Sequence, residues 1–552
     1  MIAMDGHGMS GSADGGTAQP EGRCCAGCGA PQRDSDGWFC PRCGAVLGGE
    51  AAWHRHPGLA PLLSSPSWDD DLVRALDLPV TEVPLISVGG GLGSFALLDL
   101  LRILGLPASR LRALGPRSSP IALYRELAEA SGIDSQTRIR SDSSSSIDNI
   151  WGWPGYAARE AFTEGKLRPL WQVLTEPLFS EPYTPQSGQV YRGVAREAVR
   201  IGWADLLSRG WARLVRKRRE GGYYVLQEDQ VGTLSLWHAG HLHLAIGHPG
   251  IRISPALAAW RQASADTLRF THVYERHEHI YEGLRQHGGT VVVQGAGVAA
   301  SQEVAILAAL ATRPCTPPIR VVRVVHPRTP EEDLPDGRFG VRQLTGSGFR
   351  YQDYSWPKAM FGGSLAARYA RGDDEERAAL ARQLGRSSTP LRAEWQVPLV
   401  AGRHAGWLQS VRGEVSRLEE APQGRVRIVV GGGEHEITAD WLIDATGLDN
   451  QPGLSPLVAD MLACGLASTN ARGGLAVDDA FRVRGAESGD GRLYASGALV
   501  AGGPIAPVDS FWGLQRAALD IATSLAAAGW CDELTAGRSI RGWWRWLGNR
   551  AP

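Results

Sequence analysis

The sequence predicts an α/β fold with two Rossmann-like domains, preceded by a small metal-binding module. Near residue 85 an apolar segment runs into a glycine-rich loop and then a helix, and the same order recurs near residue 290. Strands that alternate with helices in this way form parallel sheets. The metal-binding module is predicted by two closely spaced cysteine pairs near the N-terminus.

The composition excludes several function classes. The 552 residues carry 57 basic and 58 acidic side chains, so no excess of positive charge is available to bind nucleic acid. No apolar run reaches the ~18 residues that span a bilayer, and residues 1–19 contain no apolar segment typical of a secretory signal. We therefore expect a cytoplasmic protein with no transmembrane segment.

The first cysteine pair is Cys25 and Cys28, the second is Cys40 and Cys43, and eleven residues separate the pairs. Each CxxC turn places two thiolates on one side of a tight knuckle, and two knuckles make a tetrahedral site that suits Zn²⁺. The segment resembles a short zinc ribbon. Disulfides are disfavoured in a cytosolic chain, and rubredoxin-like iron sites use a much longer spacer. Because four thiolates leave no open position, the expected role is structural or in docking a protein partner.

The first glycine-rich loop, residues 89–94, follows an apolar strand at 85–88 and precedes a helix at 95–104. Glycines in such a loop let the backbone approach a pyrophosphate at the helix N-terminus. The next strand, 110–114, lacks the acid that usually binds a ribose. The loop also resembles the nucleotide loop of ubiquitin-activating-type adenylyltransferases, so an adenylating enzyme stays open. The candidate ligands here are Gly89, Gly91, Gly93 and Ser94.

The second loop follows a strand at 290–294 and precedes a helix at 301–310 and a strand at 319–325. Its candidate ligands are Gly295, Gly297 and Ala300. The following strand again lacks an acid and carries arginines instead. Arg323 and Arg328 are candidate ligands for the 2′-phosphate of NADP, which favours NADP over NAD. The alternative interpretation is a solvated arginine face.

Two later segments complete a recognisable order of motifs: a strand that ends in Ala445-Thr446-Gly447, and a strand at 491–498 before a helix at 512–528. This order resembles the flavoproteins with two dinucleotide-binding domains, including class B-type flavin monooxygenases and pyridine-nucleotide reductases. The resemblance implies that the 89–94 loop binds FAD and the 295–300 loop NAD(P)H. It also implies that Ala445, Thr446 and Gly447 close the first domain and that Gly497 approaches the flavin. Ala498 stands where the family has an aspartate.

The predicted organisation follows from these motifs. The expected units are a disordered tail (1–23), the zinc ribbon (24–50), a linker (51–83), the first part of an FAD-binding domain with an insertion (84–285), an NAD(P)H-binding-like domain (286–400), and the second part of the FAD-binding domain with a C-terminal helix (401–552).

Eight histidines lie between His238 and His287, and His241 and His243 are expected to share one face of a strand. They could form a metal or proton-transfer site, or be separate hydrogen-bonded side chains, and we favour the second interpretation.

The sequence supports two hypotheses. The first is an FAD-dependent oxidoreductase that uses NAD(P)H, in the manner of a monooxygenase, on a small-molecule substrate or a redox partner. The second is a zinc-ribbon adaptor or redox-sensing scaffold whose flavoprotein body is degenerate. The missing ribose acids and Ala498 favour the second, and the order of the loops along the chain favours the first. The late segments argue against an adenylating enzyme.

Overall fold

The computed structural model describes residues 56–139, 155–175, 183–263, 268–327, 363–383 and 393–552, together with the short hairpin of β12 (Leu344–Thr345) and β13 (Gly348–Phe349). The predicted tail, the zinc ribbon with Cys25, Cys28, Cys40 and Cys43, and Arg328 lie outside the described residues. Among the residues that the structure describes, no helix is both long and apolar enough to cross a membrane.

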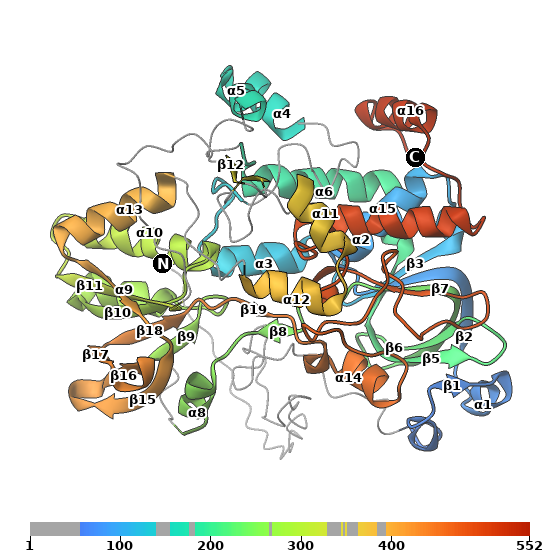
Figure 1. Cartoon of the computed structure of the whole chain (residues 1–552), viewed down its shortest axis with the longest axis horizontal. Helices are drawn as coiled ribbons and strands as arrows, with labels where there is room; N and C mark the ends of the chain where they lie inside the picture. The colour runs from blue at the N-terminus through green and yellow to red at the C-terminus, as the bar shows by residue number, and fades with distance from the viewer. Residues whose placement is uncertain are drawn as a thin grey trace, which may run out of the picture.

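The first sheet has eight strands (Figure 1). In spatial order these are β1 (Ser67–Trp68), β5 (Trp211–Arg218), β6 (Tyr223–Glu228), β7 (Leu234–Leu244), β2 (Val80–Val88), β3 (Leu111–Gly115) and β4 (Leu207–Arg209), with β20 (Leu493–Ala495) also paired to β7. The strands β4, β3, β2, β7 and β20 are parallel, whereas β5, β6 and β7 pair antiparallel. The predicted loop–helix unit is confirmed, because β2 leads through 89–91 into α2 (Leu92–Ile103).

A large apolar core fills the space between this sheet and the helices that cover it. The helix α2 packs beside α15 (Phe511–Ala527), and α6 (Ser187–Ile201) packs against α2 on its other side. Leu97, Leu98 and Leu101 of α2 are fully buried in this core. The helix α15 therefore packs on the first sheet, although more than 400 residues separate it from α2.

The second sheet has five parallel strands in the order β14 (Leu408–Arg412), β11 (Ile319–Val325), β10 (Gly289–Gln294), β18 (Trp441–Asp444) and β9 (Phe270–His272). The helices α9 (Glu278–His287), α10 (Val298–Ala311) and α13 (Ala393–Ala405) supply apolar side chains to one face. The other face packs on α8 (Pro255–Ala263) and on a three-stranded antiparallel sheet of β15 (Val415–Ala421), β16 (Arg425–Val430) and β17 (His435–Ala439).

The division between the two sheets differs from the predicted boundaries. Residues 408–412 and 441–444 are strands of the second sheet, because β14 pairs with β11 and β18 pairs with β10, so this sheet extends past the predicted boundary at 400. Residues 207–244, which fall in the predicted insertion, form β4–β7 of the first sheet. Pairing between strands that are distant in sequence determines both the boundary at 400 and the position of residues 207–244. No local sequence motif indicates this pairing.

Two of the connections between the sheets pair with one another. β8 (Gly250–Ile251) lies on the outward path and β19 (Leu448–Asp449) on the return path, and they form a two-stranded antiparallel ribbon. The remaining elements are α1 (Asp70–Ala75), α3 (Ala122–Ala130), α4 (Gly155–Glu164), α5 (Arg168–Thr175), α7 (Trp203–Leu206), α11 (Gly363–Arg371), α12 (Asp374–Gln383), α14 (Pro456–Ala463) and α16 (Ala536–Leu547).

Candidate site at two glycine-rich sheet edges

Four parallel strands of the first sheet end side by side, and their backbones approach closely at that edge. Gly89 follows β2 with φ of +130°, and a Cβ on it would lie 2.1 Å from the carbonyl oxygen of Ala245, just after β7. A Cβ on Gly115, the last residue of β3, would lie 2.6 Å from the carbonyl oxygen of Gly89. Only glycine fits either position, so the sequence keeps this edge free of side chains.

The loop then presents the N-terminus of α2 to open space. Gly91 is the N-cap of α2, no side chain caps the helix there, and a Cβ on Gly91 would meet no atom within 4 Å. The hydroxyl of Ser94 instead accepts a hydrogen bond from the Gly90 amide at 3.1 Å, which holds the loop against the helix. The amides of an uncapped helix N-terminus attract anions, and a pyrophosphate fits this position.

Gly93 allows α2 to approach the neighbouring strand ends. A Cβ on Gly93 would lie 2.9 Å from Ala245 Cβ and 3.5 Å from the hydroxyl of Ser496, which follows β20. The next residue, Gly497, has φ of +75° and begins a buried 3₁₀ turn, Gly497–Val500. The structure thus brings together the predicted residues at 89–94 and Gly497, from opposite ends of the chain.

A buried histidine joins three of these strand ends. His243 of β7 lies between two hydroxyls, with Nδ1 2.8 Å from Ser87 Oγ and Nε2 2.8 Å from Ser496 Oγ. Burial lowers the pKa of His243 to about 3, so the ring is neutral at physiological pH. The interpretation of this residue as a separate, hydrogen-bonded histidine agrees with these contacts. Within the described ranges, no three metal-ligating side chains form a group that could hold an ion.

The second edge repeats the geometry of the first. Gly295 follows β10 with φ of +138°, and a Cβ on it would lie 2.5 Å from the carbonyl oxygen of Ala445, just after β18. Gly297 is the N-cap of α10, again without a side-chain cap, and Ala300 is fully buried in the first turn of that helix. Its small side chain lets α10 pack close to the loop, as the GxGxxA pattern predicts.

Arg323 does not lie where the sequence interpretation placed it. Its side chain is fully buried, and Nε donates a hydrogen bond to the carbonyl oxygen of Gly295 at 3.2 Å. The guanidinium group therefore supports the loop from within the sheet–helix layer. Arg323 shares a face of β11 with Val321, which packs with the side chains of α9, α10 and α13.

The strand β18 leads into Ala445, Thr446 and Gly447, which leave the second sheet toward the two-stranded ribbon. The amide of Thr446 donates to Asp444 Oδ1 at 3.0 Å, and Gly447 has φ of +98°. Burial raises the pKa of Asp444 to about 7. On the adjoining strand β9, His272 lies at the same register, and burial lowers its pKa to about 3. The loop therefore ends a strand of the second sheet rather than closing the first domain as the resemblance implied, because β18 pairs with β10.

Sequence reasoning missed the residues that meet these loops from other strands. Gly115, Ala245 and Ser496 form the first edge with the predicted glycines. The one available signal was the Gly115-Pro116 pair at the end of a strand, since glycine there reports a close backbone approach.

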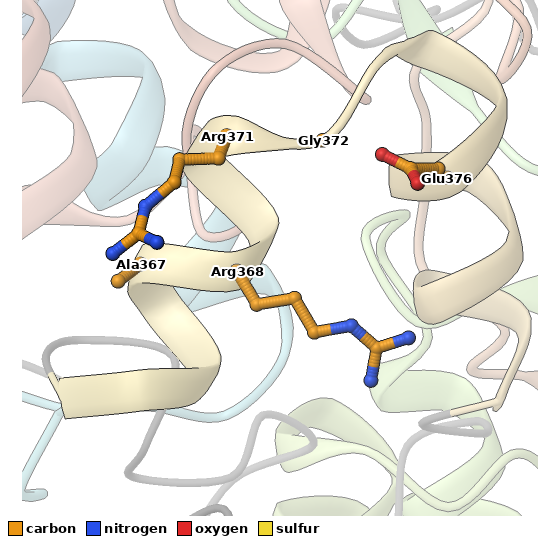
Figure 2. A pocket seen from close by; sticks show the side chains of 5 residues that line it. All are labelled: Ala367, Arg368, Arg371, Gly372 and Glu376. Atoms are coloured by element: carbon orange, nitrogen blue, oxygen red, sulfur yellow. The ribbon is translucent and has the colours of Figure 1, made fainter.

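A separate pocket lies between α11 and α12, lined by Ala367, Arg368, Arg371, Gly372 and Glu376. Figure 2 shows the two arginine side chains pointing away from each other and Glu376 on the far side of Gly372. These charged groups do not converge on one point, so the pocket is not assembled as an anion clamp.

No protein-family model and no curated protein matches the sequence. Solved structures match its fold at low identity. The ornithine hydroxylase of Pseudomonas aeruginosa is 15% identical, with a TM-score of 0.56, over 81% of this chain and 99% of that one. The ornithine N-hydroxylase of Kutzneria sp. 744, solved with reduced FAD, NADP⁺ and L-ornithine, is 15% identical, with a TM-score of 0.57, over 81% of this chain and 100% of that one.

A third solved structure is the FAD-bound cadaverine monooxygenase of desferrioxamine biosynthesis from Erwinia amylovora. It is 14% identical, with a TM-score of 0.58, over 81% of this chain and 95% of that one. All three alignments cover nearly the whole of the solved chain and leave about a fifth of this one unmatched. The chain therefore shares the two-sheet α/β fold of these solved hydroxylases and monooxygenases.

Proposed function

We propose that this protein is an FAD-dependent oxidoreductase that takes its electrons from NADPH and acts as a monooxygenase on a small molecule. The observation that carries the proposal is the pair of glycine-lined sheet edges, each with an uncapped helix N-terminus, joined in one chain by a two-stranded ribbon. A single edge of this kind suits one dinucleotide, and two edges suit a donor and an acceptor.

The first edge fits the pyrophosphate of FAD. The open space above Gly91 admits a ligand, and the uncapped amides of α2 supply hydrogen-bond donors to its charge. Gly89 and Gly115 keep side chains out of the same edge, and Gly497 does so from the β20 side. Bound FAD would supply the redox chemistry, accepting hydride from NADPH and activating oxygen. The chain itself binds, orients and shields the cofactor.

The second edge fits NADPH through Gly295 and Gly297, with Ala300 allowing the close approach of α10. Because Arg323 is buried, a 2′-phosphate would be met by Arg328 or by the backbone after β11, and NADH stays the alternative donor. The β8–β19 ribbon connects the two edges, so it is the segment across which the nicotinamide must be presented to the flavin.

The structures with a similar fold indicate which class of substrate to test first. The matched structures are named for ornithine, cadaverine and, in Pseudomonas syringae, L-lysine. These substrates are all amines, so small primary amines are the first class to test on this chain. A redox partner in place of a small molecule stays within the proposal.

Purified protein tests the proposal directly. We expect visible flavin absorption, retained after desalting or after reconstitution with FAD, that bleaches on anaerobic addition of NADPH and returns with oxygen. A protein that stays colourless after reconstitution with FAD would contradict it.

Two departures from the family pattern support a second candidate function. Ala498, which is buried after Gly497, replaces a carboxylate, and no acid ends β3 or β11 at the ribose positions. These features fit an adaptor or redox sensor that binds flavin without turnover and docks a protein through its zinc ribbon. Bound flavin that neither NADPH nor NADH reduces would favour this second function over the first.

A further inference from the structure

Exposed apolar side chains are concentrated on a few helices. Of the thirteen large apolar side chains exposed in the described ranges, eight lie on the α4–α5 hairpin, on α6 and on α16. They are Phe162, Leu167, Trp171, Leu174, Val199, Ile540, Trp544 and Leu547. Single exposed apolar residues need no explanation, but a concentration of this kind marks an interaction surface.

The helix α16 has one face held by the protein and one face exposed. The ring of Trp546 lies 4.8 Å from the guanidinium of Arg196 on α6, and Arg200 of α6 donates to the carbonyl oxygen of Arg550 at 3.1 Å. Ile540, Trp544 and Leu547, spaced i, i+4 and i+7, share another face. Trp544 is 63% exposed. The anchoring contacts to α6 therefore fix the helix with this apolar face outward.

The charged side chains of α16 are all basic. Arg538, Arg541 and Arg545 are exposed and share a third face, and residues 535–552 contain no aspartate or glutamate. Arg538 pairs with Asp532, which precedes the helix, at 2.6 Å. A helix that carries exposed tryptophan and aliphatic side chains beside a row of arginines is suited to the boundary between water and an anionic bilayer.

The α4–α5 hairpin adds a second apolar element. Leu170 and Val173 of α5 pack on the main core, whereas Trp171 and Leu174 on the same helix are exposed, as is Phe162 of α4. Figure 1 shows α4, α5 and α16 projecting from the same edge of the molecule, above α6. Lys166 lies between α4 and α5, and Arg168 is the first residue of α5.

We propose that α16, together with the α4–α5 hairpin, docks this protein onto the surface of a negatively charged lipid bilayer. The apolar side chains would enter the headgroup boundary, and the arginines would pair with lipid phosphates. The charge decides between occupants: a second copy would bring its own arginines to this face, whereas an anionic surface complements them.

Vesicle flotation of the full chain tests this. The probe is phosphatidylcholine vesicles with and without phosphatidylglycerol, at low and high salt. We expect flotation with the anionic vesicles only, weakened at high salt because the Debye length shortens. Arg541→Glu with Arg545→Glu should weaken partition by roughly thirtyfold or more, since each basic residue near the surface contributes about a factor of five.

Trp544→Asp with Leu547→Asp should also abolish flotation, whereas Val231→Asp, at an exposed apolar site on a different turn, should leave it unchanged. All of the substituted side chains are exposed in the structure. Circular dichroism and bound flavin show whether each variant protein has folded. Flotation that is absent with anionic vesicles, or unaffected by both double variants, overturns the proposal. A stable dimer that Trp544→Asp dissociates would assign the surface to a second copy and would overturn it as well.

Discussion

Replacing Gly91 by alanine should separate cofactor binding from folding. The new methyl group would meet no protein atom within 4 Å, and φ at this position is −97°, which alanine adopts freely. The folded protein should lose only the modest difference between glycine and alanine at an N-cap, about 1 kcal/mol, and Tm should fall by a few degrees.

The same methyl group would stand in the space proposed for the FAD pyrophosphate. Overpacking by one methyl group costs about 1–3 kcal/mol, which corresponds to a 5- to 150-fold weaker Kd for FAD. Fluorescence titration of the apoprotein with FAD measures this value, and thermal unfolding of the apoprotein reports the fold.

Gly453→Ala is the matched control, because its Cβ also meets no atom within 4 Å but it lies in a 3₁₀ turn, Pro452–Leu454, outside both glycine-rich loops. We expect Gly453→Ala to bind FAD as the unsubstituted protein does. If Gly91→Ala also binds FAD with unchanged affinity, the first loop is not the pyrophosphate site, and the reasoning from its open space is refuted.

Three further predictions concern single residues. Arg323→Ala should lower stability by about 2–4 kcal/mol through loss of a buried hydrogen bond and its packing, seen as a lower Tm; an unchanged Tm with a selective loss of NADPH affinity would instead make it a phosphate ligand. The raised pKa of Asp444 means that its folded form holds a proton which the unfolded chain releases, so its own contribution to stability falls from about pH 4 to about pH 7. The lowered pKa values of His243 and His272 act in the opposite direction between about pH 3 and pH 6.5. Asp444→Asn should therefore make the urea midpoints rise more steeply with pH in this range, and a slope equal to that of the unsubstituted protein would exclude this assignment. The purified chain should hold about one zinc ion, measured by metal analysis, and Cys40→Ser should release it, whereas Cys315→Ser, an exposed free cysteine, should not.

The strand–loop–helix units of the fold could be predicted from sequence, because the residues that determine each unit lie in one short segment. The strand, loop and helix around Gly89 and again around Gly295 fall where periodicity and glycine spacing predict them. Their partners across the sheets could not be predicted, since Gly115 and Ala245 reach Gly89 only through the pairing of β3 and β7 with β2.

The misplacement of Arg323 has a specific physical cause. Arginines after a nucleotide loop suggest a phosphate ligand, but a strand sends alternate side chains to opposite faces, and Arg323 shares the buried face of Val321. The sequence pattern cannot distinguish the two faces of a strand that is buried on both. The partition of residues 408–412 and 441–444 was missed for a related reason, because only strand pairing reports which sheet they join.

The arrangement of His243 between two serine hydroxyls constrains where protons lie across the first edge. A neutral imidazole carries one N–H, so it donates to one hydroxyl and must accept from the other. If Nδ1 donates to Ser87, Ser496 must donate to Nε2; the other tautomer reverses both bonds together. The direction of the hydrogen bond at Ser496, whose hydroxyl faces Gly93, is thus coupled to the direction at Ser87 on β2. A ligand that accepts a hydrogen bond from the Ser496 hydroxyl would therefore select the tautomer of His243 without contacting it.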